Sequence, residues 1–144
     1  MPKIIVLDSH VWFWWINRDN DRLSPPLLMA IENAERVGVS VVSCYEIAVA
    51  HHRNRLDLSM LPFEWFSKAL DDSGVELLPV TPEICVRATN LSQVHRDPFD
   101  RMIIATALQQ DGTLVSIDGQ FSAYPELNGR LIGRKGSTVA GEES

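Results

Sequence analysis

The chain has 144 residues, of which 45% are hydrophobic and 22% charged. This composition is typical of one compact domain with its own apolar core. The formal net charge of −6 excludes a protein that coats nucleic acid through bulk positive charge, because phosphate neutralisation supplies most non-specific affinity. Any contact with nucleic acid is therefore local. The candidate cations for it are Arg53, Arg55, Lys68, Arg96 and Arg101.

The sequence shows no sign of export or membrane insertion. Lys3 is followed by only four apolar residues, Ile4 to Leu7, which is too short a stretch for a signal peptide. The longest apolar run, Val11 to Ile16, is far below the roughly 20 residues that a membrane-spanning helix needs. We therefore expect a cytoplasmic protein with no membrane segment. We also expect Cys44 and Cys85 to stay reduced.

Short apolar runs rich in β-branched residues predict buried strands of the kind found in parallel sheets. The first begins at Lys3 and ends at Leu7, immediately before an aspartate. The others are residues 39–42, 75–80 and 113–117, with a weak edge strand at residues 130–132.

Segments with helical periodicity lie between these runs. Ser24-Pro25 and Thr81-Pro82 each place a capping hydroxyl before a proline suited to the first helical position. The helices predicted in full span residues 43–54, 62–72, 82–91 and 98–110. Strands that alternate with helices predict an α/β domain whose mainly parallel central sheet of four to five strands is flanked by helices. We assign residues 1–133 to this single domain and residues 134–144 to a flexible polar C-terminal tail.

Five carboxylates are placed near the carboxyl ends of the predicted strands, or at the start of a helix beside them. They are Asp8, Glu46, Asp97, Asp100 and Asp118. In an open α/β sheet, ligands bind outside the carboxyl ends of the strands. The sequence therefore predicts one acidic site at this edge.

Carboxylates gathered this closely repel one another and raise one another's pKa values unless a positive charge lies between them. A hard divalent cation resolves the repulsion, and Mg²⁺ or Mn²⁺ suits an all-oxygen ligand set. Such an ion could activate water and stabilise the leaving oxygen of a phosphodiester. Zinc is disfavoured, because the histidines and cysteines lack paired spacing and the side chains of the adjacent His51 and His52 diverge on a helix.

Several of these acids also have a purely structural interpretation. Ser43 to Glu46 reads as a capping box, and Asp8 could cap the helix that begins near Val11. Asp97 precedes Pro98, so it fits the N-cap position, and Asp100 is then the third helical residue. We therefore assign Asp97 mainly to capping and Asp100 mainly to metal binding.

Four motifs in these same segments resemble PIN-domain ribonucleases of the VapC type, the toxins of bacterial toxin–antitoxin (VapBC) operons. The family's Leu-Asp-Thr-His with a following aromatic turn is similar to Val6–Trp12, and its Trp-Glu-Ile-Ala after a serine is similar to Ser43–Ala48. The third motif, His95–Ala107, matches almost letter for letter, and the fourth is Leu114–Asp118. The matches follow the family's order and span nearly the whole predicted domain.

This resemblance implies a metal-dependent endoribonuclease whose catalytic, metal-binding acids are Asp8, Glu46, Asp100 and Asp118, with Asp97 a possible fifth. It also implies an RNA substrate, Mg²⁺ or Mn²⁺ as cofactor, a homodimer, growth arrest through RNA cleavage, and a cognate VapB-type antitoxin whose C-terminal segment covers the site. Serines at positions 9 and 116 replace the family's threonines. Each keeps a hydroxyl with which to contact a site acid.

Two other classes of function remain as alternatives. A receiver domain is also a small α/β domain with acids at strand ends, but it needs paired acids after its first strand and a lysine at the end of its last strand. Here Asp8 is followed by Ser9 and His10, and no lysine lies between Lys68 and Lys135. A catalytically silent PIN-like module that binds RNA or protein would be expected to have lost an acid. An aromatic cluster could line a groove for a partner helix, although ordinary core packing is favoured for most of its rings. Its members are Trp12, Trp14, Trp15, Phe63, Trp65 and Phe66.

Overall fold

The computed structural model describes residues 3–138 and centres on one six-stranded sheet with the order β3-β2-β1-β4-β5-β6. The strands are β1 (Ile4–Leu7), β2 (Arg36–Ser40), β3 (Glu76–Leu78), β4 (Thr113–Val115), β5 (Leu131–Gly133) and β6 (Gly136–Thr138). Each neighbouring pair among the first five is parallel, and β6 runs antiparallel to β5. The predicted mainly parallel α/β domain is confirmed, with one strand more than expected.

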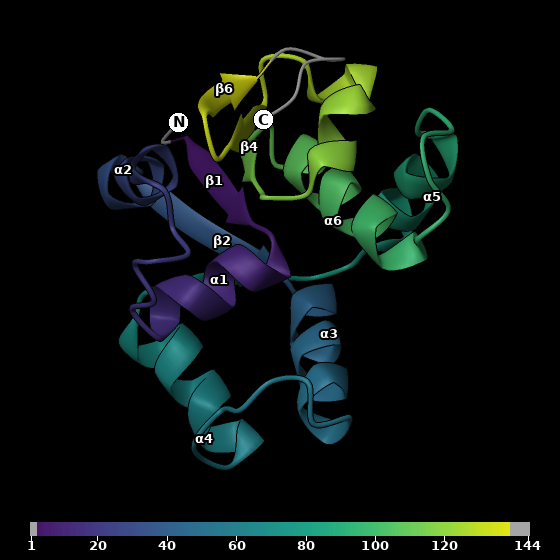
Figure 1. The fold of residues 1–144 in the computed structure, drawn as a ribbon. Helices are drawn as coiled ribbons and strands as arrows, with labels where there is room; N and C mark the ends of the chain where they lie inside the picture. Colours follow the sequence, from purple (N-terminus) through teal and green to yellow (C-terminus); the bar gives the residue numbers. More distant parts are fainter. Residues whose placement is uncertain (1–2, 139–144) are drawn as a thin grey trace.

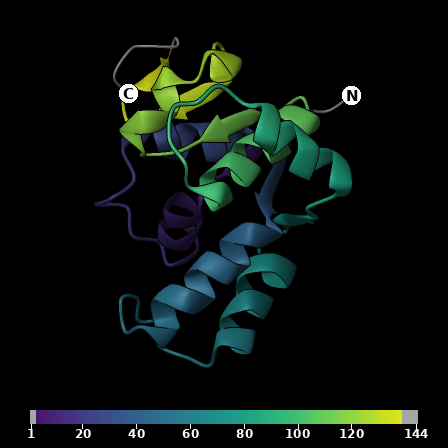
Figure 2. The same ribbon diagram turned by 90° about the vertical axis from the view of Figure 1, so that its right-hand side faces the viewer.

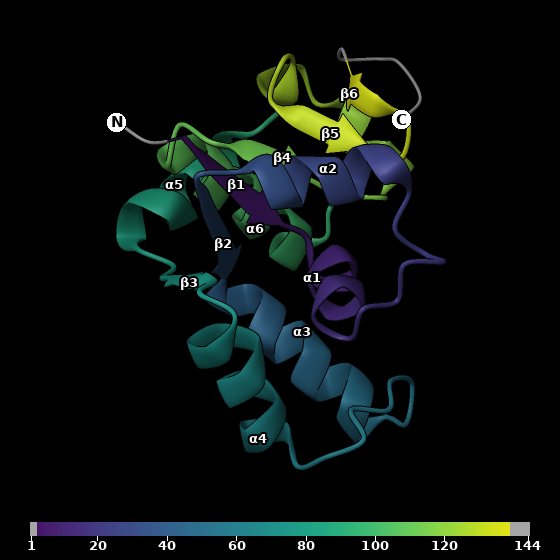
Figure 3. The same cartoon turned by 90° about the vertical axis from the view of Figure 1, so that its left-hand side faces the viewer.

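Helices cover both faces of this sheet (Figures 1 and 3). The helices are α1 (Ser9–Ile16), α2 (Pro25–Asn33), α3 (Val41–His52), α4 (Pro62–Ser67), α5 (Pro82–Asn90) and α6 (Pro98–Gln109). A π-helical turn at Lys68–Asp72 extends α4, and two 3₁₀ segments lie at Gly119–Ala123 and Pro125–Leu127. None of the helices within residues 3–138 is long and apolar enough to cross a membrane.

Alternate residues of β1 face two different cores. Ile5 and Leu7 belong to the apolar cluster that includes side chains of α1, α2 and α4. Ile4 and Val6 belong to the cluster formed with α6 and the 3₁₀ segments. All four side chains are buried, because a central parallel strand is covered on both faces.

The strand register aligns the carboxyl ends of the three strands nearest the predicted site. Leu7, the last residue of β1, pairs with Val39 of β2 on one side and with Val115 of β4 on the other. The residues that follow these strand ends therefore emerge at the same edge. Helix α3 leaves from this edge and, with α4, projects beyond the carboxyl ends of the strands (Figures 1 and 2).

The strand predicted at residues 39–42 is corrected by the structure. Strand β2 ends at Ser40, and Val41 and Val42 form the first turn of α3. The side-chain oxygen of Ser40 accepts a hydrogen bond from the Val42 backbone N–H at 3.1 Å. This N-cap satisfies one of the free amides of the first turn, and it outweighs the weak β preference of two valines.

The C-terminal part of the sheet extends further than expected. The predicted flexible tail begins at residue 134, whereas residues 136–138 form β6 and pair with β5. Gly136 has a φ of 106°, a conformation that glycine adopts without steric cost, and it lies directly after the turn that joins the two strands. The rest of the predicted tail, residues 139–144, lies outside the described residues.

Candidate metal centre

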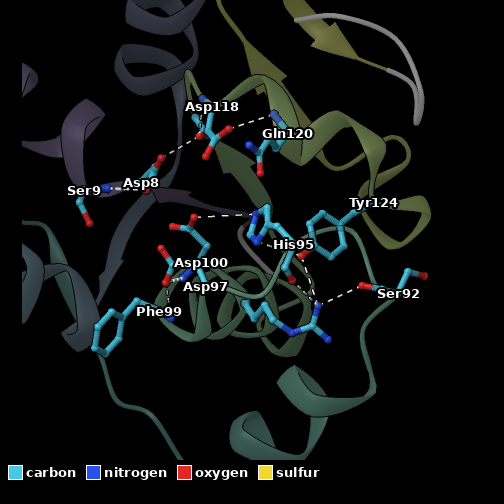
Figure 4. A network of polar contacts seen from close by, with 12 residues as sticks. Asp8, Ser9, Ser92, His95, Asp97, Phe99, Asp100, Asp118, Gln120 and Tyr124 are labelled. Atoms are coloured by element: carbon cyan, nitrogen blue, oxygen red, sulfur yellow. Dashed lines mark hydrogen bonds and ion pairs between the residues drawn. The ribbon is translucent and has the colours of Figure 1, made fainter.

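Four of the predicted acids come together at the carboxyl edge of the sheet, and Figure 4 shows three of them, Asp8, Asp100 and Asp118. One oxygen from each of Asp8, Glu46 and Asp100 lies within 4.8 Å of the other two. Asp118 lies close to Asp100 in the same way, in a second group that is completed by His95. Asp8 follows β1, Asp118 follows β4, and the other two acids are carried by α3 and α6.

Two serine hydroxyls hold the acids of this cluster. The Ser116 hydroxyl donates to Oδ2 of Asp8 at 2.7 Å and accepts the backbone N–H of Asp118 at 3.0 Å. The Ser9 hydroxyl donates to Oε1 of Glu46 at 2.8 Å and is also hydrogen-bonded with the buried Ser43. The serines that replace the family's threonines therefore make the expected contacts with site acids.

The capping box predicted at Ser43–Glu46 does not form. Helix α3 begins two residues earlier, with Ser40 as its N-cap, so Ser43 is the third helical residue. Its side chain is buried against Ser9 rather than turned to the helix start. The Glu46 carboxylate is thereby directed to the acidic cluster.

Capping does occur at the other two positions considered. Asp8 is the N-cap of α1 and accepts the Ser9 backbone N–H through Oδ1, while its Oδ2 faces Ser116. Asp97 is the N-cap of α6 and accepts the backbone N–H of Phe99 at 2.9 Å. Asp97 belongs to neither group of close donor atoms, whereas Asp100 belongs to both. The capping role of Asp97 is therefore confirmed, and the metal-binding role of Asp100 stays a prediction.

The electrostatics of the cluster favour protonated acids in the absence of a cation. Burial, and then the negative charge of the neighbouring acids, raises the pKa of Asp100 to about 8. Burial also raises the pKa of Asp8, although the hydrogen bond from Ser116 opposes this shift. The pKa of Glu46 is raised by burial and lowered in part by Ser9. A cation placed among these acids would oppose the shifts, because a nearby positive charge favours the ionised form of a carboxyl group.

The comparisons with known proteins agree with this geometry. Residues 5–127, most of the chain, match the family described as the PIN domain. The chain belongs to the PIN domain family. It is 31% identical over 121 residues to Ribonuclease VapC22 of Mycobacterium tuberculosis, an alignment that covers 83% of this chain and 91% of that protein.

Solved structures share the PIN fold. VapBC2 from Rickettsia felis, bound to a DNA fragment from its promoter, aligns with a TM-score of 0.64 and 20% identity, covering 89% of this chain and 96% of the other. DNA-bound VapBC from Salmonella typhimurium aligns with a TM-score of 0.58 and 18% identity, covering 91% and 97%. The resemblance carried by the four sequence motifs is confirmed.

The donor atoms at the edge of this PIN domain fit a hard cation. Asp8, Glu46, Asp100 and Asp118 supply carboxylate oxygens, the ligands that Mg²⁺ and Mn²⁺ prefer. A nitrogen also lies close to the acids: Nε2 of His95, which is buried without a hydrogen-bond partner, is 3.8 Å from Oδ2 of Asp100. A single histidine among four carboxylates is a poor match for the nitrogen-rich and sulfur-rich sites of zinc.

His95 was not assigned a role from the sequence, although it opens the most specific motif. Its Nδ1 lies 3.4 Å from the Tyr124 hydroxyl, which accepts a hydrogen bond from Nη1 of Arg101 at 3.3 Å. Because arginine only donates, the hydroxyl hydrogen is free to point at Nδ1. This arrangement favours the tautomer whose proton is on Nε2, facing Asp100 (Figure 4). Tyr124 lies beyond every motif, so no signal in the sequence connected it to the site.

The prediction that Arg101 could contact nucleic acid is wrong. Arg101 is buried, and its guanidinium donates to the backbone carbonyls of residues 88, 91, 92 and 95. It ties the end of α5 and the following loop to α6 and is not available to a phosphate. Arg53, Arg55, Lys68 and Arg96 are exposed.

The aromatic cluster divides between core and surface. Trp12 and Trp65 are fully buried, with ring centroids 5.2 Å apart, and Trp14 is buried nearby. Trp15 and Phe66 are partly buried against the same core, whereas Phe63 is 91% exposed. Core packing thus holds for most of these rings and fails for Phe63.

Proposed function

We propose that this PIN domain is a metal-dependent endoribonuclease that acts as the toxin of a type II toxin–antitoxin module. The observation that carries the proposal is the close approach of Asp8, Glu46 and Asp100, whose oxygens lie within 4.8 Å of one another. The 31% identity to a protein named a ribonuclease supports RNA as the substrate.

In this proposal Asp8, Glu46, Asp100 and Asp118 hold Mg²⁺ or Mn²⁺. When bound by these acids, the ion would supply an activated water and would stabilise the leaving oxygen of the phosphodiester. Ser9 and Ser116 fix the directions of the Glu46 and Asp8 carboxylates, so that little reorganisation is needed when the ion binds. Asp97 contributes by starting α6, the helix that presents Asp100.

The proposed partners follow from the relatives. The similarity to VapBC complexes supports a VapB-type antitoxin, whose cationic side chain would be attracted to an acidic cluster that lacks its ion. We also propose a homodimer. Because cellular RNA is the proposed substrate, we place the protein in the cytoplasm.

The test is incubation of the purified protein with total RNA, with and without Mg²⁺, beside the Asp100→Asn variant. Cleavage is expected only for the wild-type protein with the ion, and mapping the cut ends would identify the target. Undiminished cleavage in excess chelator, or equal cleavage by Asp100→Asn, would contradict the proposal. Absence of cleavage from every RNA tested would favour the silent PIN-like binding module instead.

A further inference from the structure

A cleft runs from the acidic cluster along α3. Its volume is about 420 Å³. It is lined by Ser9, Glu46 and Asp97, and also by Arg53 and Arg55, which come about two helical turns or more after Glu46 along the chain. We call it the α3 cleft. The same depression therefore contains a proposed metal-binding acid and a pair of cations separated from it.

Two aromatic rings line the α3 cleft beside the acids. The ring centroids of Tyr45 and Phe99 lie 5.3 Å apart, with an angle of 49° between the ring planes. Tyr45 directly precedes Glu46 on α3, and Phe99 directly precedes Asp100 on α6. The helices that deliver the two acids therefore also deliver the two rings.

The exposure of Tyr45 distinguishes it from the aromatic core, whereas Phe99 is partly buried against an apolar cluster. Tyr45 is 57% exposed, whereas the similarly spaced Trp12 and Trp65 have no exposed surface. An aromatic ring left in water next to a reactive site offers its face to a ligand. Nucleobases stack on such rings irrespective of their identity, because every base has a π-face.

The charges of the α3 cleft complement a nucleic-acid strand. Arg53 and Arg55 are exposed, and within residues 3–138 neither forms an ion pair with a carboxylate. In a chain of net charge −6, two unpaired cations in the cleft provide the local phosphate contact that bulk charge does not. The acids and their neighbouring rings lie at one part of α3 and the cations follow its end, which suits a strand that enters at the arginines and reaches the acids.

We propose that the α3 cleft binds a nucleotide of single-stranded RNA beside the scissile phosphate. Its base stacks on Tyr45 and Phe99, and a neighbouring phosphate contacts Arg53 and Arg55. This inference rests on the proposed RNA-cleaving function. It assigns two rings and two cations outside the acidic cluster to substrate binding, and it requires an unpaired base, because a base held in a duplex cannot present its face to the rings.

The test measures binding apart from cleavage. A fluorescently labelled pool of random 12-nucleotide single-stranded RNA is titrated with the Asp100→Asn protein in Mg²⁺, so that binding is read without turnover. Adding Tyr45→Ala is expected to weaken binding roughly 5- to 150-fold, the range for loss of one stacked base. Tyr45→Phe should restore binding close to the parent value, because it keeps the ring.

Matched controls separate the cleft from general effects. Phe63→Ala removes an exposed ring on α4 outside the cleft, and Arg87→Ala removes an exposed cation on α5. Both should leave affinity within twofold. The Arg53→Ala/Arg55→Ala double variant should weaken binding and reduce the dependence of affinity on salt, since fewer counterions are released. Melting curves of all variants establish that each is folded.

The outcomes distinguish this inference from the proposed function. The cleft would be overturned as a nucleotide site if Tyr45→Ala and Phe63→Ala bound the single-stranded RNA with equal affinity. The same would follow if the parent protein bound a duplex of the same length as tightly as the single strand. An intact RNA affinity combined with loss of binding to the partner protein would overturn it too and assign the cleft to that partner. Wild-type cleavage of the same pool is scored in parallel: its absence counts against the nuclease alone, and a retained Tyr45 effect would still support the cleft.

Discussion

The hydroxyl of Ser116 joins two site acids that are 110 residues apart in the sequence: it donates to Oδ2 of Asp8 at 2.7 Å and accepts the Asp118 backbone N–H at 3.0 Å. Asp8 and Ser116 follow the paired ends of β1 and β4, so the bond depends on the parallel register of these strands. Ser116 is thus both a support of the site and a contact between two central strands.

Replacing Ser116 by alanine should impair both stability and metal binding. The change leaves the buried Asp8 Oδ2 without its donor, which should cost about 1–3 kcal/mol of unfolding free energy. Mn²⁺ affinity should fall about 10- to 100-fold, the usual effect of removing a contact to a metal ligand. Urea unfolding and Mn²⁺ titration measure the two effects. Ser122→Ala is the control, because its hydroxyl bonds only within its own turn. It should lose stability without losing Mn²⁺ affinity, and equal Mn²⁺ affinity of both variants would argue against this role of Ser116.

Substitution of Asp97 should mainly reduce stability, and substitution of Asp100 should mainly reduce activity. Asp97→Ala removes the cap of α6 and should cost about 0.5–2 kcal/mol, with residual cleavage by the folded protein. Asp100→Asn should melt at or above the wild-type temperature, because it removes one of several crowded anions, while cleavage falls by orders of magnitude. Thermal melts measure the stability of each variant, and single-turnover cleavage measures its activity. A stable but inactive Asp97→Ala protein, together with an active Asp100→Asn protein, would reverse the assignment.

The metal-free protein should lose stability as the pH rises from about 4 to 8. The pKa of Asp100 is about 8 in the folded state, against 3.8 as its ordinary value. In this interval the folded state holds a proton that the unfolded state has released, so folding is favoured at low pH and the advantage disappears as Asp100 ionises. Asp8 and Glu46 shift in the same direction.

Chemical unfolding at several pH values, with chelator present, measures this dependence. Asp100→Asn should flatten the fall, and saturating Mn²⁺ should reverse it, because ion binding releases the proton. The raised pKa of Asp100 would be contradicted if the metal-free wild-type protein became more stable between pH 6 and 8 and Asp100→Asn showed the same pH dependence.

Tyr124→Phe should change the tautomer of His95 with little change in fold. The hydroxyl that faces Nδ1 is lost, while the guanidinium of Arg101 keeps its four backbone carbonyls. The ¹⁵N chemical shifts of the His95 ring in metal-free protein should therefore move away from those of a ring protonated only on Nε2. Tyr45→Phe changes the chain's other tyrosine, which lies outside this network, and serves as control. Identical His95 shifts in the two variants would exclude Tyr124 as the group that sets the tautomer.

The sequence alone predicted the architecture, and it singled out four acids that the structure brings close together. Apolar runs that end at acids, proline after a capping residue and four ordered motifs predicted the parallel sheet, most helices and the four residues Asp8, Glu46, Asp100 and Asp118. These features are local, because propensity, capping and strand ends are encoded by neighbours in the chain. The same local reasoning failed where two local rules compete, as at Val41 and Val42, which follow the Ser40 cap into α3 rather than extending β2.

Contacts between distant residues were decided by tertiary structure. The Ser116–Asp8 bond, the Tyr124–His95 contact and the Tyr45–Phe99 pair each join segments from different elements. Arg101 reads as a surface cation in sequence but is buried, because the end of α5 brings several carbonyls to it. Residue type sets which partners a side chain can accept, but only strand register and helix packing determine which partner is within reach. The sequence therefore determined which acids this protein carries, and the fold determined what supports them and what lies beside them.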